Sequence, residues 1–147
     1  MDPEEIALRL GDDFPTGDID NEALDEIRRR LRRTRLSRGV ISYSDLVSGI
    51  VFRHGTFWGG EEHLVDTSNW TGLDRQMIGG ILAKLSVESV RAHGYLVGVM
   101  VVSKDTLEPS GVFYDWLYDC GVLTHSSQEA REEMWISHLT LAHNHRG

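Results

Sequence analysis

The sequence predicts a single, mostly helical α+β domain with few short strands. The chain has 147 residues, of which 40% are apolar and 26% are charged, a composition typical of a globular protein that closes one core. Most of the apolar residues recur three or four positions apart, which is the spacing of one helix face. Two short apolar stretches, at 39–42 and 95–102, instead have the composition of strands.

Residues 1–17 are predicted to form an acidic arm, flexible at least in part, ahead of a globular domain at 18–147. Gly11 and Pro15 interrupt this segment, so we expect at most one short helical turn in it. It carries acids where a signal peptide would carry basic residues, and no apolar run approaches the roughly 20 residues of a membrane helix. Together with a single cysteine, Cys120, these features predict a cytoplasmic protein.

The first long helix is predicted to begin at Asp18 or Asp20, since either residue suits an N-cap. Leu24, Ile27 and Leu31 then recur at helical spacing. Acids crowd the first turns of this segment and arginines crowd the last, a polarity that suits the helix dipole.

A second helix is predicted after the short strand at 39–42. Ser42 and Asp45 form a capping box at its start, and apolar residues extend the pattern as far as Gly55. Residues 55–72 then hold four glycines and two tryptophans without a sustained period, so they are expected to form a long loop or an irregular excursion.

The longest helix is predicted to begin at the capping box of residues 71–74 and to end near Gly94. Gly79 and Gly80 lie inside it, where each glycine costs about 1 kcal/mol relative to alanine. We therefore expect another backbone to pack closely against this pair. The following segment, YLVGVMVV at 95–102, is predicted to be a strand that is covered on both faces.

Two helices complete the predicted order. After a turn, one helix is expected to end at Gly121, and the last is expected to open at a third capping box, formed by Ser126 and Glu129. The predicted order is helix, short strand, helix, loop, long helix, strand, helix and helix. This order contains a winged-helix-like centre.

Two segments carry a resemblance to known families. GVISYSDL at 39–46 and IGGIL at 78–82, followed by the apolar strand, resemble the DNA-binding half of the alkylguanine alkyltransferases and of alkyltransferase-like proteins. Residues 39–120 also resemble a family of small, uncharacterised bacterial proteins. The alkyltransferase Pro-Cys-His-Arg run, or its variant with tryptophan, is replaced here by HGYLVGVMVV. The resemblance therefore implies a fold, without alkyl transfer and without the residues of a base-flipping pocket.

Charge is distributed unevenly along the chain, whose formal net charge is −8. Residues 1–27 carry ten acids and one arginine, residues 28–38 carry seven arginines and no acid, and residues 39–147 carry thirteen acids and seven bases. Such an asymmetry has two interpretations: an anionic partner binds the arginines, or neighbouring acidic segments neutralise them.

The arginines are the first candidate binding residues. If the helix buries its leucines and isoleucine, Arg28, Arg32 and Arg35 form one stripe with Arg29 and Arg33 beside it, a geometry that suits a phosphate backbone. Three interpretations stay open: nucleic acid, an acidic protein partner, or an internal clasp with the upstream acids.

The first turn of the long helix is the second candidate. Arg75 and Gln76 would occupy the reading position of a winged helix, where arginine and glutamine can contact guanine and adenine edges. The alternative is an ordinary solvated first turn, and the negative net charge disfavours non-specific DNA affinity.

Histidines raise the alternative of a metal site. The tail places His138, His143 and His145 within eight residues, and His54 and His63 flank the glycine-rich loop. Zinc needs about four converging ligands, which a fraying helix end supplies poorly. The sequence therefore predicts no metal ligand, no cofactor and no catalytic residue.

Aromatic residues in the loop suggest a partner interface. The loop rings are Phe57, Trp58 and Trp70, and exposed tryptophans and tyrosines are favoured interface anchors. Together with four later aromatics they exceed what a small core readily hides: Phe113, Tyr114, Trp116 and Tyr118. A homodimer or another protein partner follows as a hypothesis.

The leading functional prediction is a non-enzymatic binding or regulatory module of a prokaryote or its phage, acting on nucleic acid or on an acidic protein surface and not on a membrane. One alternative is a small metal-dependent hydrolase that uses histidines and glutamates. The other is a protein–protein adaptor or inhibitor with no nucleic-acid role.

Overall fold

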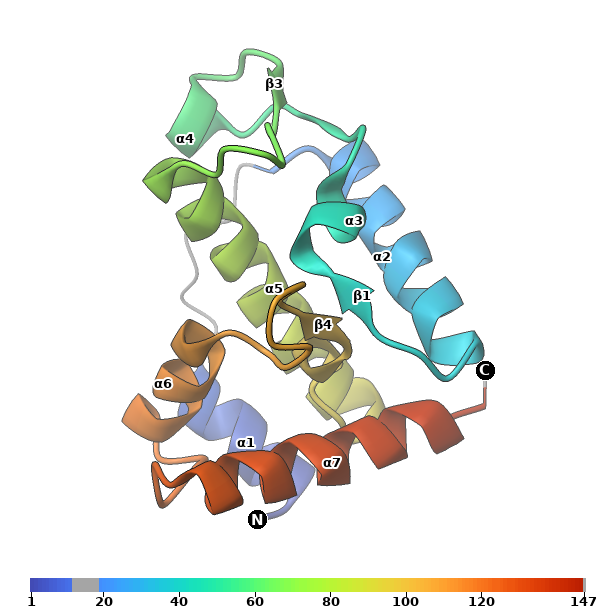
Figure 1. Ribbon diagram of the computed structural model, residues 1–147, viewed down its shortest axis with the longest axis vertical. Helices are drawn as coiled ribbons and strands as arrows, with labels where there is room; N and C mark the ends of the chain where they lie inside the picture. Colours follow the sequence, from blue (N-terminus) through green and yellow to red (C-terminus); the bar gives the residue numbers. More distant parts are fainter. Residues whose placement is uncertain (12–18, 147) are drawn as a thin grey trace.

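Helix α5 (Gly72–His93) is the central element of the computed structural model (Figure 1). The structure describes residues 1–11 and 19–146. The 22 residues of α5 span about 33 Å at a rise of 1.5 Å per residue. Thr71 begins the helix with the predicted capping box, since its hydroxyl accepts from the amide of Asp74 and the Asp74 carboxylate accepts from the amide of Thr71. Gly94 ends it in the left-handed conformation.

The chain is a mostly helical α+β domain, as predicted. None of the helices in the described part of the chain is long and apolar enough to cross a membrane. In chain order the other elements are α1 (Pro3–Leu10), α2 (Asn21–Leu36), β1 (Ile41–Ser42), α3 (Tyr43–Val47), β2 (Val51–Phe52), α4 (Gly55–Trp58), β3 (His63–Leu64), the 3₁₀ helix η1 (Val97–Met100), β4 (Val101–Val102), α6 (Gly111–Asp119) and α7 (Gln128–Asn144).

Two hydrophobic clusters lie along α5, one on each half of the helix. The first joins the N-terminal half of α5 to α2, α3 and β2, and Ile27 and Leu46 are fully buried in it. The second joins the C-terminal half of α5 to α1, η1, α6 and α7, and Leu96 and Leu117 are fully buried there. Helix α2 runs toward the C-terminal end of α7 and contacts that helix (Figure 1).

The beginning of the chain differs from the predicted arm. Residues Pro3–Leu10 form an eight-residue helix rather than at most one turn. Ile6 and Leu10, one turn apart on the same face, are buried in the second cluster, where α1 packs against α5. A helix this short is marginal by itself, so the contact with α5 stabilises it. The other residues of the predicted arm, at 12–18, lie outside the described part of the chain, as does the alternative N-cap Asp18.

The predicted strand at 95–102 is only partly a strand. Its last two residues form β4, which pairs in parallel with β1, and its middle forms η1. The amide of Leu96 donates to Nδ1 of His138 over 3.0 Å, and the amide of Gly98 donates to Oγ of Ser86 over 3.0 Å. Because side chains take these hydrogen bonds, the segment needs no neighbouring strand over most of its length.

Two predicted helix boundaries are wrong. Helix α3 ends at Val47 and not near Gly55, because Gly49 adopts a φ of 75° and the chain then enters β2, which pairs antiparallel with β3. Helix α7 begins one residue later than predicted, since Ser127 and not Ser126 is its N-cap.

The close backbone approach that was predicted at the glycine pair of α5 does not occur at Gly79. A Cβ atom added to Gly79 would meet nothing within 4 Å. A close approach of side chains occurs at Gly98 of η1, where an added Cβ would lie 2.9 Å from Oγ of Ser86 and 3.0 Å from the ring of Phe113. Helix α5 and η1 therefore approach each other beside Ser86, further along α5 than predicted.

Candidate functional site

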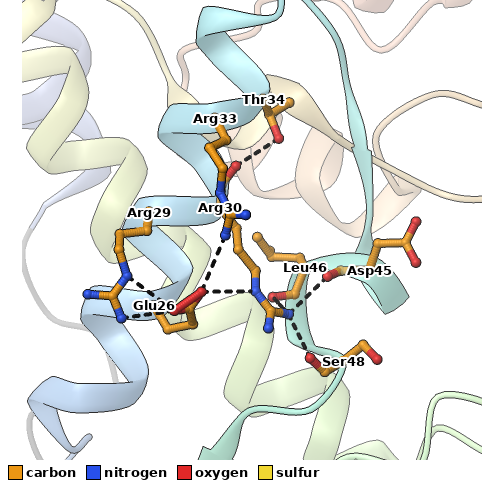
Figure 2. Close-up of polar contacts among 8 residues, drawn as sticks. All are labelled: Glu26, Arg29, Arg30, Arg33, Thr34, Asp45, Leu46 and Ser48. Carbon is orange, nitrogen blue, oxygen red and sulfur yellow. Dashed lines mark hydrogen bonds and ion pairs between the residues drawn. The ribbon is translucent and has the colours of Figure 1, made fainter.

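The arginines of α2 fall into two groups on different sides of the helix. The helix begins at Asp20, one of the two predicted N-caps, whose carboxylate accepts from the amide of Ala23. One group surrounds Glu26 (Figure 2) and consists of Arg29, Arg30 and Arg33. The other group lines a groove and consists of Arg28, Arg32 and Arg35.

Glu26 draws the first group together. Its carboxylate lies 2.8 Å from Nη2 of Arg29, 3.4 Å from Nε of Arg30 and 3.5 Å from Nη2 of Arg33. The hydrogen bond from Arg29 is the main cause that lowers the pKa of Glu26. Arg29 and Arg33 therefore have an intramolecular partner, Glu26 of the same helix.

Arg30 fixes α3 against α2. Its Nη1 atom donates to the carbonyl oxygens of Asp45, Leu46 and Ser48 over 3.1, 3.2 and 2.7 Å (Figure 2). These carbonyls belong to the end of α3, where a helix leaves its acceptors without partners. Arg30 is thus a structural residue, which explains one member of the arginine run without a ligand.

The second group faces a groove of about 550 Å³ between α2 and the C-terminal half of α5. Glu88 and His93 of α5 and the tail after α7 form its other walls. Apolar side chains also line it, among them the buried residues Leu31, Leu85 and Met100.

The guanidinium groups of the groove differ in their availability. Nη2 of Arg28 lies 2.9 Å from the Glu88 carboxylate and its Nη1 lies 3.3 Å from Asp25, both at exposed positions. Arg32 and Arg146 are exposed, and neither makes a hydrogen bond or an ion pair with the residues that the structure describes. Two of the arginines are therefore open to a ligand.

Arg35 holds the C-terminal tail at the groove. Only 6% of Arg35 is exposed, and its Nη1 donates to the carbonyl oxygen of His145 over 2.7 Å. Beside it, Nε2 of His143 donates to the carbonyl oxygen of Gly39 over 2.9 Å. These two contacts join the tail to the end of α2 and to the segment that follows it, and they bring Arg146 to the groove.

Three rings stand together at the same end of the groove. The ring centroids of His93 and His145 are 4.2 Å apart, and Tyr95 lies 6.0 Å from the first and 5.6 Å from the second. Burial, with His93 and Arg35 nearby, lowers the pKa of His145, and burial raises the pKa of Tyr95. Around pH 7 these two rings are therefore mainly neutral surfaces.

The groove is a local concentration of positive charge on an acidic protein. Four arginines and one glutamate line it, whereas the whole chain has a formal charge of −8. A guanidinium group presents a fork of N–H donors that matches the oxygens of phosphate or carboxylate. With apolar lining and neutral rings beside these donors, the groove can bind an anion that carries an apolar or aromatic part.

The structure separates the two sets of predicted nucleic-acid contacts. Arg75 and Gln76 are exposed in the first turn of α5. The groove lies against residues Leu85 to His93, near the other end of that helix. One small ligand therefore cannot touch both sets, and each needs its own test.

The predicted partner-interface aromatics are used within the chain. Phe57, Trp58 and Trp70 are half-buried and pack against the first hydrophobic cluster. Nε1 of Trp58 lies 3.1 Å from Sδ of Met77, and Nε1 of Trp70 donates to Oγ of Ser44 over 3.4 Å. The structure thus accounts for these rings as core cover, which removes the argument that they need a partner to hide them.

The histidines that were candidate metal ligands make separate contacts within the chain. Nδ1 of His138 accepts from the amide of Leu96, while His143 and His145 hold the tail as described above. Nε2 of His63 contacts the buried Asp74 carboxylate over 2.7 Å. Among the described residues there is no group of three or more histidine, cysteine or acidic side chains that could hold a metal ion.

Comparisons with protein-family models, with curated proteins and with solved structures found no match, so the groove is interpreted from its own geometry. Sequence reasoning missed His93, Tyr95, Glu88 and Arg146 as neighbours of the arginine stripe. They reach it from α5, from the segment between α5 and η1, and from the tail, and the contact of Arg35 with the tail spans 110 residues. The only sequence signal for them is the basic character of the final residues, HNHRG.

Proposed function

We propose that this chain is a non-enzymatic binding module that holds the phosphate groups of a nucleic acid in the groove between α2 and α5. The carrying observation is that Arg32 of α2 and Arg146 of the C-terminal tail both line the groove without a partner among the described residues. Exposed cations gathered in one concavity attract anions more strongly than the same charges scattered on a surface.

Phosphate fits this groove better than the carboxylates of an acidic protein. Its cations are all arginines, whose fork binds both anions, but its lining also includes the neutral rings of Tyr95 and His145 and buried apolar side chains. Those surfaces match the sugar and base of a nucleotide, whereas a stretch of aspartates and glutamates offers them nothing. A cytoplasmic, regulatory role accompanies this proposal and rests on composition.

A second candidate site is the first turn of α5, which the winged-helix interpretation assigns to duplex contact. The exposure of Arg75 and Gln76 favours it. It lacks the concavity and the converging charges of the groove, so it is the second choice.

Charge-matched variants of the full chain separate the two sites. R32Q removes a groove arginine, R75Q removes one from the first turn of α5, and R33Q removes an exposed arginine that faces Glu26. Affinity is measured by fluorescence anisotropy with labelled single-stranded and duplex oligonucleotides at about 50 and 200 mM salt. We expect R32Q alone to weaken binding, by roughly tenfold, and to reduce the salt slope by about 0.7 on single strands.

Three other outcomes decide against the proposal. A loss of affinity in R75Q with none in R32Q would assign binding to the first turn of α5. Equal losses in all three variants would indicate a net-charge effect without a site. No binding to any oligonucleotide, with binding to polyglutamate that R32Q abolishes, would make the chain an adaptor for acidic proteins.

A further inference from the structure

The size of the groove limits what can enter it. Its volume of about 550 Å³ lies within the roughly 300–1,000 Å³ range of sites for small ligands. Helices α2 and α5 form two of its walls, and the tail residues His145 and Arg146 also line it. A double helix presents its phosphates on a convex surface and buries its bases in stacked pairs, so it cannot place a base inside such a hollow.

The positive charges and the rings are arranged for two different parts of one ligand. Arg32 and Arg146 provide exposed guanidinium groups, and Arg28 can add a third if its contact with Glu88 opens. His93 is exposed, and its ring is held at 4.2 Å from that of His145, which is itself anchored through the carbonyl contact with Arg35. Phosphate donors and an aromatic surface therefore lie within one groove.

Unpaired nucleotides are recognised by this combination of groups. Proteins that bind single strands pair a basic groove for the backbone with aromatic side chains on which bases stack. Histidine and arginine planes serve as such surfaces in RNA recognition. An acidic peptide would use the arginines and leave the ring cluster and the apolar lining unused.

We infer, building on the proposed function, that the groove receives an unpaired nucleotide of single-stranded nucleic acid, with its phosphate between Arg32 and Arg146 and its base against the ring of His93. DNA and RNA share this chemistry. Arg35 is a positioning residue, because it holds the tail that carries Arg146 and does not itself need to touch the ligand.

The test compares strands that differ only in their bases. The full chain is titrated with a labelled single-stranded DNA of about 12 nucleotides, a size typical of single-strand sites, and with an abasic strand that has the same phosphates. The same sequence as RNA and as duplex DNA completes the set. The variants are H93A and, as a matched control, H125A, which removes an exposed histidine that does not line the groove.

We expect the native chain to bind the intact strand at least about fivefold more tightly than the abasic strand, because a stacked base contributes that much or more. H93A should lose this difference while it keeps its affinity for the abasic strand, and H125A should keep both. The duplex should bind more weakly than either its DNA or its RNA single strand. The preferred single strand identifies whether DNA or RNA is the source of the nucleotide.

The inference and the proposed function fail in different ways. If strands bind and R32Q weakens them, but intact, abasic and duplex forms bind equally or H93A changes nothing, the nucleotide inference is wrong and the binding function stands. If no strand binds to the native chain, the proposed function is wrong and the inference falls with it.

Discussion

Arg28 and Glu88 form an ion pair of 2.9 Å that joins α2 to α5 along the groove. Both side chains are close to half exposed, so the pair contributes little to stability but occupies a guanidinium group that a phosphate would otherwise use. We predict that E88Q raises affinity for single-stranded DNA at low salt by up to about fivefold, equivalent to the roughly 1 kcal/mol that an exposed pair contributes at most.

Anisotropy titrations measure this effect, with E133Q as the control because it removes an exposed acid of α7 that does not line the groove. A gain of equal size in both variants would mean that only the net charge matters. A loss of affinity in E88Q would show that the glutamate supports the site.

Gly79 and Gly98 should respond oppositely to alanine. G79A should stabilise the chain by about 0.5–1 kcal/mol, since the added methyl meets nothing and the unfolded chain loses freedom. G98A should destabilise it by about 1–3 kcal/mol, because the methyl would lie 2.9 Å from Ser86. Urea denaturation followed by circular dichroism gives both values, and changes of the same sign would contradict the packing of η1 on α5.

Among the three arginines of α2 that contact Glu26, Arg30 should contribute most to the stability of the chain. R30A removes a charged donor from three carbonyl oxygens at the end of α3, so we expect a loss of about 1.5–3 kcal/mol in the free energy of unfolding. R33A should change the free energy of unfolding by less than about 0.5 kcal/mol, because the Arg33 side chain is 73% exposed and its contact with Glu26 is long, at 3.5 Å. Equal effects of the two variants would show that the carbonyl contacts carry no stability.

His138 should make stability depend on pH. Burial lowers the pKa of this ring, whose Nδ1 accepts from the amide of Leu96, so the unfolded chain takes up the proton first as pH falls. The neutral ring therefore contributes its full stability above the ordinary histidine pKa of about 6.5, and this is lost as pH falls below that value toward the lowered pKa of the folded state.

H138N tests this assignment, because asparagine can offer an oxygen acceptor near the position of Nδ1 but does not titrate. Urea midpoints at about pH 7.5 and 5.5 should differ less in H138N than in the native chain. H125N serves as the control, since His125 is exposed. An unchanged pH dependence in H138N would assign the effect to other groups.

Local signals identified most of the secondary structure. The caps at Asp20, Ser42 and Thr71 each accept the expected backbone amide, because a helix start depends on a few adjacent residues. The prediction of a strand over 95–102 is only partly correct for the opposite reason: amides of this segment bond to Ser86 and His138, which no local pattern indicates.

The residues of the candidate site also divide into those that local spacing identifies and those that only tertiary contacts bring together. Helical spacing alone places Arg28, Arg32 and Arg35 on one stripe of α2, and the groove contains all three. Whether an arginine of the run is structural or open to a ligand depends on partners elsewhere, as the carbonyls around Arg30 and the tail beside Arg35 show.

The sequence by itself determined a mostly helical domain, the starts of α2, α3 and α5 and a helix with a basic stripe, because these follow from residue spacing and capping within one element. Only the tertiary structure decided that α1 packs on α5, that the loop aromatics cover the core, and that rings and an arginine from distant segments meet the stripe in one groove. One such contact, from Arg35 to His145, joins residues 110 positions apart, and these contacts arise from how the whole chain buries its apolar surface.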